Sequence, residues 1–244
     1  MVTVLSGFPQ TFGQTLLTSS STQQHPLGAY AETPDGRGFR YALVGATSTV
    51  AGKVYQGTPL DATNLQPSGG LGVNAAVAIG DTSIVTSTST TWAANLLAGG
   101  YLSVNVTPGQ GYTYRIKSNT ATSAATGGTI VLEDPIQVAL TTSSKFIVAQ
   151  HPYSGIVIEP GTPTAAIAGV ATYIITNAQY GWVQTRGACS VLFTGTGVAG
   201  KAVGSLSGGT SGSVAPAIAA TNIIGYHMAT GITTEYALIF LTLG

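Results

Sequence analysis

The segment at residues 195–201 has the glycine spacing of a phosphate-binding loop. Its sequence, GTGVAGK, matches both G-x-G-x-x-G and G-x-x-x-x-G-K. Such a loop holds phosphate only where a strand leads into it and a helix leaves it, so that the helix N-terminus faces the anion. Ala202 follows Lys201, where a phosphate loop needs a hydroxyl for magnesium, and the glycine-rich sequence beyond disfavours a helix. We therefore predict a plain β-turn and no nucleotide site.

Metal-ligating residue types are few and scattered. The three histidines, His25, His151 and His227, have no second His, Cys or carboxylate beside them at a ligand spacing. The single cysteine, Cys189, lies in the apolar run ACSVL, which is typical of a small core residue. One cysteine excludes an intrachain disulfide. We expect no bound metal and no cofactor.

The acidic residues do not suggest a catalytic pair. Glu133 and Asp134 are adjacent, and neighbouring side chains of a strand point to opposite faces, so they would not share a proton easily. Asp134, before Pro135, is expected to cap backbone groups in a turn. A Ser-His-Asp triad needs only spatial proximity and stays open, but the G-x-S-x-G elbow is absent. We predict that the protein is not an enzyme.

Aromatic and basic residues combine in the segment YGWVQTRG at residues 180–187. On an extended strand, Tyr180, Trp182 and Arg186 fall on one face, and these residue types are favoured at the centres of interfaces. Alternatively, Trp182 is half-buried core and Arg186 lies over it. Both interpretations stay open. The candidate interface residues are Phe8, Phe12, Tyr180, Trp182 and Arg186.

The elements that must position these residues are predicted to be almost entirely β-strands. Turn-forming residues interrupt the chain roughly every 8–12 residues, and the pieces between are rich in Val, Ile, Thr and Tyr. Asp35-Gly36 predicts a hairpin. The tetrapeptide Val-Ala-Gly-Lys at 50–53 and 198–201 predicts two tight turns that each open a short strand. Residues 91–98 alone favour a short helix, which Gly99 and Gly100 would end.

Three regions are expected in an all-β fold of β-sandwich or β-barrel units. Residues 1–28 lack a clear strand period and are interpreted as an extended N-terminal arm. Residues 29–160 form a β domain with an inserted loop or subdomain at about 60–128. Residues 161–244 follow a proline-rich turn and form a second β unit.

Composition and charge exclude several classes of protein. Lys plus Arg and Asp plus Glu each number 8, and charged residues are 7% of the 244-residue chain, against roughly 25% in an ordinary soluble domain. Without a basic excess, we expect no nucleic-acid partner. No apolar run approaches the roughly 18 residues that span a bilayer, and the N-terminus does not resemble a signal peptide, so no membrane partner is expected. Low charge leaves little repulsion between copies, which suits a protein that works inside an assembly.

Several segments resemble small structural proteins encoded beside the major capsid gene of tailed bacteriophages. The last eighty or so residues also look like the small β-barrel of phage head-decoration (cement) proteins, in which Val/Ala-rich strands alternate with glycine turns. The segments that carry the resemblance are HPLG at 25–28 leading to DGRGFRY at 35–41, GGYL at 99–102, GYTYRIKSN at 111–119, LEDP at 132–135, YGWVQTRG at 180–187, and 225–231 followed by TEY at 234–236.

The resemblance implies a virion protein on the capsid exterior, assembled in the cytoplasm of a bacterial host. Its implied partners are the major capsid protein and itself, as a homotrimer, and its role is to stabilise contacts between major capsid subunits. The region at about 60–128 is then a projecting domain or an added clamp. The alternatives are another virion part, such as a head fibre or tail component, and an enzyme or sugar-binding module on the virion.

Overall fold

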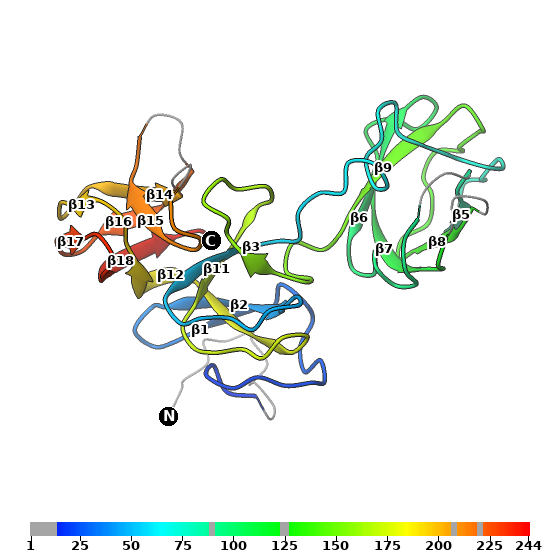
Figure 1. The fold of residues 1–244 in the computed structure, drawn as a ribbon. Helices are drawn as coiled ribbons and strands as arrows, with labels where there is room; N and C mark the ends of the chain where they lie inside the picture. Colours follow the sequence, from blue (N-terminus) through cyan, green and yellow to red (C-terminus); the bar gives the residue numbers. More distant parts are fainter. Residues whose placement is uncertain (1–13, 88–90, 123–126, 206–208, 219–221) are drawn as a thin grey trace. The chain divides into compact units, whose positions relative to one another are not determined.

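The chain is built from β-strands joined by glycine-rich turns (Figure 1). The computed structural model describes residues 14–87, 91–122, 127–205, 209–218 and 222–244. Within these ranges there is no helix, and the main strand pairs are antiparallel. The predicted all-β fold is confirmed. No helix of sufficient length and apolarity to cross a membrane occurs in the described ranges.

Close contacts divide the chain into two units. Unit 1 consists of Met1–Pro59 and Pro152–Gly244, and unit 2 is the insertion Leu60–His151. The insertion starts where the sequence places it, but it extends to His151 instead of ending near residue 128. The expected boundary at residues 160/161 is absent from this division, because strands from before the insertion pair with strands from after it.

Unit 1 is organised around one large sheet. Its order is β10-β3-β11-β12-β18-β16-β14-β15, and β2, which also pairs with β1, joins it at β12. A separate two-stranded ribbon is formed by β13 and β17. The strands are β1 (Tyr30–Glu32), β2 (Gly38–Leu43), β3 (Lys53–Gln56), β10 (Val157–Ile158), β11 (Ile167–Ala171), β12 (Tyr180–Leu192), β13 (Thr196–Gly197), β14 (Ala202–Ser205), β15 (Val214–Pro216), β16 (Ile223–His227), β17 (Gly231–Ile232) and β18 (Tyr236–Thr242).

The long strand β12 connects the two halves of this sheet. Its first half pairs with β2 and β11, and its second half pairs with β18. A β-bulge lies between Gln184 and Arg186, and Gly187 follows with a φ of +84°. A Cβ added to Gly187 would lie 3.0 Å from Cγ of Arg37, so both the backbone and the space require glycine. Because a bulge bends its strand, β12 contributes to separate hydrophobic cores.

The two faces of the first half of β12 are both covered. Val183 faces one core with Ala42 and Val44, and Trp182 faces another with Phe39 and Tyr41. The second half has a single core on one face. Its buried members are Val54, Val170, Cys189, Val191, Phe193, Val203, Val214, Ile224, Ala237, Ile239 and Leu241.

Residues 14–28 pack on unit 1 and are not a free arm, which corrects the expectation for this part of the segment 1–28. The Tyr41 hydroxyl donates to Oε1 of Gln14 at 2.6 Å, and Ser20 bridges to Tyr180. Leu16 and Leu27 pack against the Trp182 core. These apolar side chains gain more from burial on their own sheet than from exposure. Residues 1–13 lie outside the described ranges.

The turn predictions in unit 1 are confirmed. Gly36, with a φ of +81°, lies in the loop between the paired strands β1 and β2. The two Val-Ala-Gly-Lys segments place Gly52 and Gly200 at φ values of +75° and +79°. Each turn leads directly into a short strand, β3 or β14. Within residues 195–201, Thr196 and Gly197 form the short strand β13, and the predicted turn follows it, closed by the hydrogen bond from the Lys201 amide to the Val198 carbonyl.

Unit 2 is a six-stranded sheet of order β4-β9-β6-β7-β8-β5. The strands are β4 (Leu71–Gly72), β5 (Ser83–Val85), β6 (Tyr101–Val106), β7 (Thr113–Asn119), β8 (Thr129–Leu132) and β9 (Lys145–Ala149). Its core includes Trp92, Leu102, Ile116 and Phe146. The alternation of buried and exposed residues along β6, β7 and β9 matches a sheet with one face in the core.

The helix predicted at residues 91–98 does not form. Asn95 has a φ of +58°, which an α-helix does not accommodate. The segment is instead a series of turns arranged around Asn119. The Oδ1 atom of Asn119 accepts a hydrogen bond from the amide of Leu97 at 2.9 Å, and its Nδ2 atom donates one to the carbonyl of Ala93 at 2.9 Å. These side-chain hydrogen bonds replace the backbone pairing that a helix would have supplied.

Candidate functional site: an exposed apolar sheet face

Trp182 belongs to the core and does not reach the surface of the chain. It is 2% exposed, and its ring lies 5.0 Å from that of Tyr41 and 5.2 Å from that of His25, centroid to centroid. Tyr180 is half-buried and stacks on Tyr41 at 6.0 Å. Trp182 is therefore a core residue, but it is fully buried and not half-buried as the core interpretation expected.

Arg186 is exposed but is not positioned as the sequence suggested. The bulge between Gln184 and Arg186 adds one residue, so the alternation that placed Arg186 on the face of Trp182 is interrupted. Arg186 interacts with the Tyr30 hydroxyl; burial and Glu32 raise the pKa of Tyr30, and Arg186 opposes them. Phe8 and Phe12, the other candidate interface residues, lie outside the described ranges.

A different surface of unit 1 has the composition of an interface. We call it the outer face: the side of strands β12, β14, β16 and β18 that points away from their core. The strand register places its residues on one side of the sheet, because Tyr226 pairs with Phe240 and with Ala202, and Leu238 pairs with Ser190. Its members are Arg186, Ala188, Ser190, Leu192, Ala202, Tyr226, Met228, Tyr236, Leu238, Phe240 and Thr242.

Large apolar side chains dominate the centre of the outer face. Tyr236, Leu238 and Phe240 are 51%, 44% and 43% exposed along β18. Tyr226 and Met228 lie beside them at 44% and 48% exposure, and the Met228 amide donates to the Leu238 carbonyl. Isolated exposed apolar residues are ordinary, but a contiguous group of this kind marks an interaction site.

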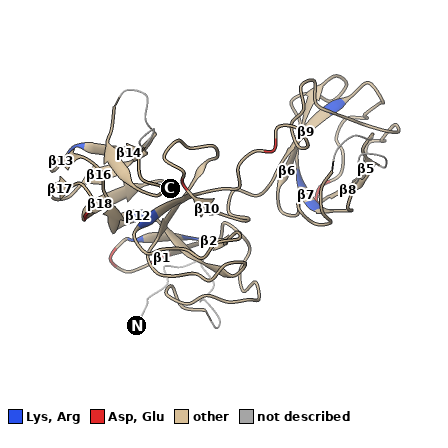
Figure 2. Ribbon diagram, viewed as in Figure 1, with Lys and Arg blue, Asp and Glu red and all other residues tan. Residues whose placement is uncertain are grey.

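The part of the outer face on β16 and β18 carries no charged residue, and Arg186, which pairs with Thr242, lies at one end of the face on β12. In Figure 2 the ribbons of β16 and β18 are uncharged, whereas lysine and arginine lie along β7 and β9 in unit 2. Charged residues are depleted at the centres of protein interfaces, and tyrosine, phenylalanine and methionine are enriched there. The residue types of the outer face therefore match an interface core.

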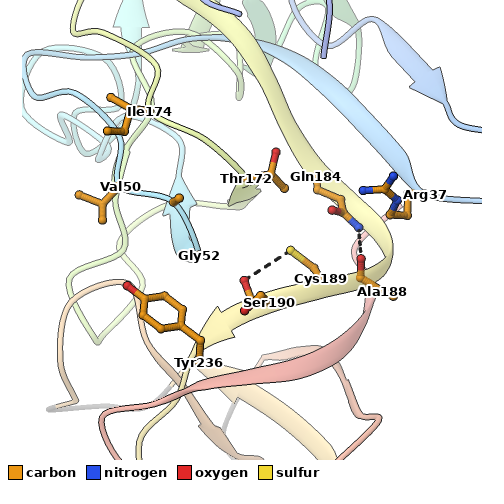
Figure 3. A pocket seen from close by; sticks show the side chains of 11 residues that line it. Arg37, Val50, Gly52, Thr172, Ile174, Gln184, Ala188, Cys189, Ser190 and Tyr236 are labelled. Carbon is orange, nitrogen blue, oxygen red and sulfur yellow. Dashed lines mark hydrogen bonds between the residues drawn. The ribbon is translucent and has the colours of Figure 1, made fainter. Parts of the chain in front are cut away.

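A pocket of about 590 Å³ adjoins the outer face at β12 (Figure 3). Ala188, Ser190 and Tyr236 line it and also belong to the outer face. Val50 and Ile174 line it as well, and both are exposed. The pocket is therefore suited to an apolar side chain of a partner.

The polar residues of this pocket do not form a reactive group. Burial raises the pKa of the Cys189 thiol to about 12, so it is not a nucleophile at neutral pH. Gln184 donates to the carbonyls of Arg186 and Ala188 and thereby holds the bend of β12. Arg37 pairs with Asp35 at 2.8 Å.

Burial is the largest cause of the pKa shifts of several titratable groups elsewhere. Burial lowers the pKa values of His25, His151 and His227, and burial raises the pKa of Glu159. Among the described residues no group of three His, Cys, Asp or Glu side chains is placed to hold a metal ion. The geometry of the described ranges thus offers an apolar surface as its strongest candidate site.

The sequence contained a signal for the outer face. Residues 236–241, YALIFL, are apolar without interruption, whereas a strand with one solvated face alternates apolar and polar residues. The run predicts a strand that is covered on both faces. Comparisons with protein-family models, with curated proteins and with solved structures found no match for this chain.

Proposed function

We propose that this protein is a structural component of a bacteriophage virion. In this proposal it is assembled in the cytoplasm of the bacterial host, binds the outer surface of the capsid and stabilises contacts between major capsid subunits. The observation that carries the proposal is the outer face, a surface of the sheet whose centre is formed by exposed apolar side chains. The resemblance of the sequence segments to phage decoration proteins is the reason for proposing a phage capsid as the assembly.

The physical chemistry of the surface supports adhesion. Burying apolar area contributes roughly 25 cal/mol per Å², and the uncharged strands β16 and β18 at the centre of the face avoid the desolvation penalty of buried ions. Contacts of modest strength become effective when many copies bind one particle.

Co-sedimentation tests the proposal. The purified protein is mixed with expanded, empty shells of the major capsid protein encoded in the same genome, and the shells are pelleted. We expect saturable binding and electron-microscopic density on the shell exterior. An unrelated protein of similar mass controls for trapping. Protein that stays in the supernatant, or density confined to the tail, would contradict the proposal.

A further inference from the structure

The two-stranded ribbon of β13 and β17, which lies beside β16 and β18 in Figure 1, covers the side chain of His227. We infer that this ribbon is an acid-released latch, which stays closed over a neutral imidazole and opens when His227 takes up a proton. Only its consequence for the outer face, given last, rests on the proposed function.

His227 lies on the inner side of β16, at the edge of the unit 1 core. Its side chain is 3% exposed, and its register partner on β18 is Ile239, which is fully buried. The ring of Phe193 meets the imidazole edge to face, with 4.7 Å between the ring centroids. The imidazole is therefore packed among apolar side chains on the side of the core.

Two glycines of the ribbon also lie against the ring. Gly197 and Gly231 pair across the ribbon, and both are buried. A Cβ added to Gly197 would collide with Cε1 of His227, and one added to Gly231 would lie 3.1 Å from the same atom. The backbone of the ribbon thus lies directly on the imidazole, in a close approach that glycine permits.

The ribbon is the part of this enclosure that can open with the least loss of structure. Each of its strands has two residues, and it forms a sheet separate from the large one. Its other two residues, Thr196 and Ile232, are exposed, so the ribbon is a single layer between His227 and solvent. Local opening is favoured where short strands and few apolar contacts hold the backbone. Opening the ribbon therefore hydrates the imidazole and leaves the large sheet intact.

The ring nitrogens of His227 make the closed state sensitive to protonation. Both are buried, and neither has a hydrogen-bond partner among the described residues. A neutral imidazole leaves one N–H unpaired here, whereas an imidazolium leaves two N–H groups and a charge unpaired. Burial lowers the pKa of His227, and the backbone of Ala229 opposes this without reaching hydrogen-bond geometry. Water pairs both N–H groups once the ribbon opens, so acid favours the open state.

No charged side chain of the packed elements offsets this cost. Strands β13, β14, β17 and β18 contain no Asp, Glu, Lys, Arg or His. The charged residues of the adjoining turns, Lys201 and Glu235, are exposed, and the nearby tyrosines, Tyr226 and Tyr236, point to the outer face. None of these four groups contributes to the pKa shift of His227. The cost of a buried imidazolium therefore falls on the ribbon.

Hydrogen exchange of the amides at 196–197 and 231–232, measured by NMR at pH 7.5 and pH 5, tests the latch. A free imidazole has a pKa of about 6.5, so the opening constant of a latch that excludes the proton when closed rises by up to about thirtyfold over this range. After correction for intrinsic exchange rates, we expect a rise of at least fivefold in the wild-type chain.

Two variants assign the effect to one histidine. His227→Phe keeps a ring beside Phe193 but binds no proton, so its ribbon should open equally at both pH values. His25→Phe is the matched control, because it removes another buried histidine of unit 1 and should retain the rise. If His227→Phe does not fold, His227→Leu replaces it.

Four outcomes overturn the inference. They are a wild-type rise below fivefold, an equal rise in the His227 variant, a loss of the rise in His25→Phe, and a wild-type His227 ring that titrates in NMR at or above its ordinary pKa. The last of these needs no variant, so the inference is tested even if both His227 substitutions prevent folding.

The latch bears on the outer face through Met228, which follows His227 and lies in the connection from β16 to β17. If the proposed function is correct, opening of the ribbon loosens this part of the face, and shell binding should weaken severalfold at pH 5 in the wild type but not in His227→Phe. A ribbon that opens in acid on a protein that binds no shells contradicts the capsid proposal alone. Shell binding by a protein whose ribbon stays closed in acid contradicts this inference alone.

Discussion

Strands β7 and β18 are both seven residues long and both alternate buried with exposed side chains, yet they expose opposite chemistry. β7 directs Thr113, Arg115 and Lys117 to solvent, while β18 directs Tyr236 and its apolar neighbours outward. The exposed face of β7 needs no partner, because its groups are well solvated. The exposed face of β18 keeps large apolar side chains in water, and covering them is favourable. Of these two exposed faces, only that of β18 therefore gains from being covered by a partner.

The largest effect should separate the two faces of β18. Ile239→Ala removes a fully buried side chain from the unit 1 core and should lower the free energy of unfolding by about 2–5 kcal/mol. Leu238→Ala, one residue away on the outer face, should change the free energy of unfolding of the dilute monomer by less than about 1 kcal/mol. Urea denaturation measures both variants. Equal losses would show that the two faces of β18 are not different environments.

A second prediction concerns how Tyr236 is held on the outer face. Gly52 has a φ of +75°, and a Cβ there would collide with the Tyr236 ring, so Gly52→Ala should cost about 2–3 kcal/mol and weaken shell binding. Gly36→Ala is the matched control, because its φ is +81° but no atom lies within 4 Å of the added Cβ. It should cost about 1 kcal/mol and leave shell binding unchanged. Identical behaviour of the two variants would remove the role assigned to Tyr236.

Glu159 in unit 1 and Glu133 in unit 2 lie in different environments, the first buried and the second exposed. Glu159 of unit 1 is fully buried, and burial raises its pKa above the ordinary value for a glutamate despite the hydrogen bond from the backbone amide of Gly161. The folded state therefore holds this proton to higher pH than the unfolded chain does, and stability falls as pH rises above about 4.5. Glu159→Gln should stabilise unit 1 by about 1 kcal/mol at pH 7. The gain should vanish near pH 4 in thermal melts, and a gain independent of pH would contradict this account.

The smallest effect is expected for the exposed carboxylate in unit 2. Glu133 lies 3.3 Å from Nε of Arg115, and both side chains are over 40% exposed. Surface pairs of this kind contribute little, so Glu133→Gln should change stability by less than about 0.5 kcal/mol. The fluorescence of Trp92, in unit 2, reports this unfolding transition in a Trp182→Phe background. A loss above 1 kcal/mol would mean that the pair matters more than its exposure indicates.

Local chemistry in the sequence was enough to predict the class of fold and several turns. Glycine at 36, 52 and 200 marks positions where φ is positive, and β-branched segments mark strands. The domain boundaries were not predictable, because pairing of β2 and β3 with strands more than a hundred residues later depends on the whole sheet. Residues 91–98 do not form a helix, because the side chain of Asn119, which is distant in sequence, makes hydrogen bonds with the backbone of this segment.

The candidate site was less accessible from sequence than the fold. Trp182 and Arg186 carry residue types of an interface, but the bulge in β12 and the packing of residues 14–28 decide their exposure, and neither follows from spacing. In contrast, the run at 236–241 needed only the expectation that an exposed strand face is polar. The informative signal was an absence of alternation, which residue-by-residue inspection of reactive groups does not find.

The central claim, that the outer face is covered when the protein works, is tested most directly at Met228. It is the one methionine within the described ranges, and its side chain is 48% exposed on the outer face of the single chain. Peroxide oxidation of Met228 is followed by mass spectrometry in dilute monomer and in the assembled protein. The account predicts oxidation at the rate of a free methionine in the monomer and strong protection on assembly. Equal rates in both states would contradict it.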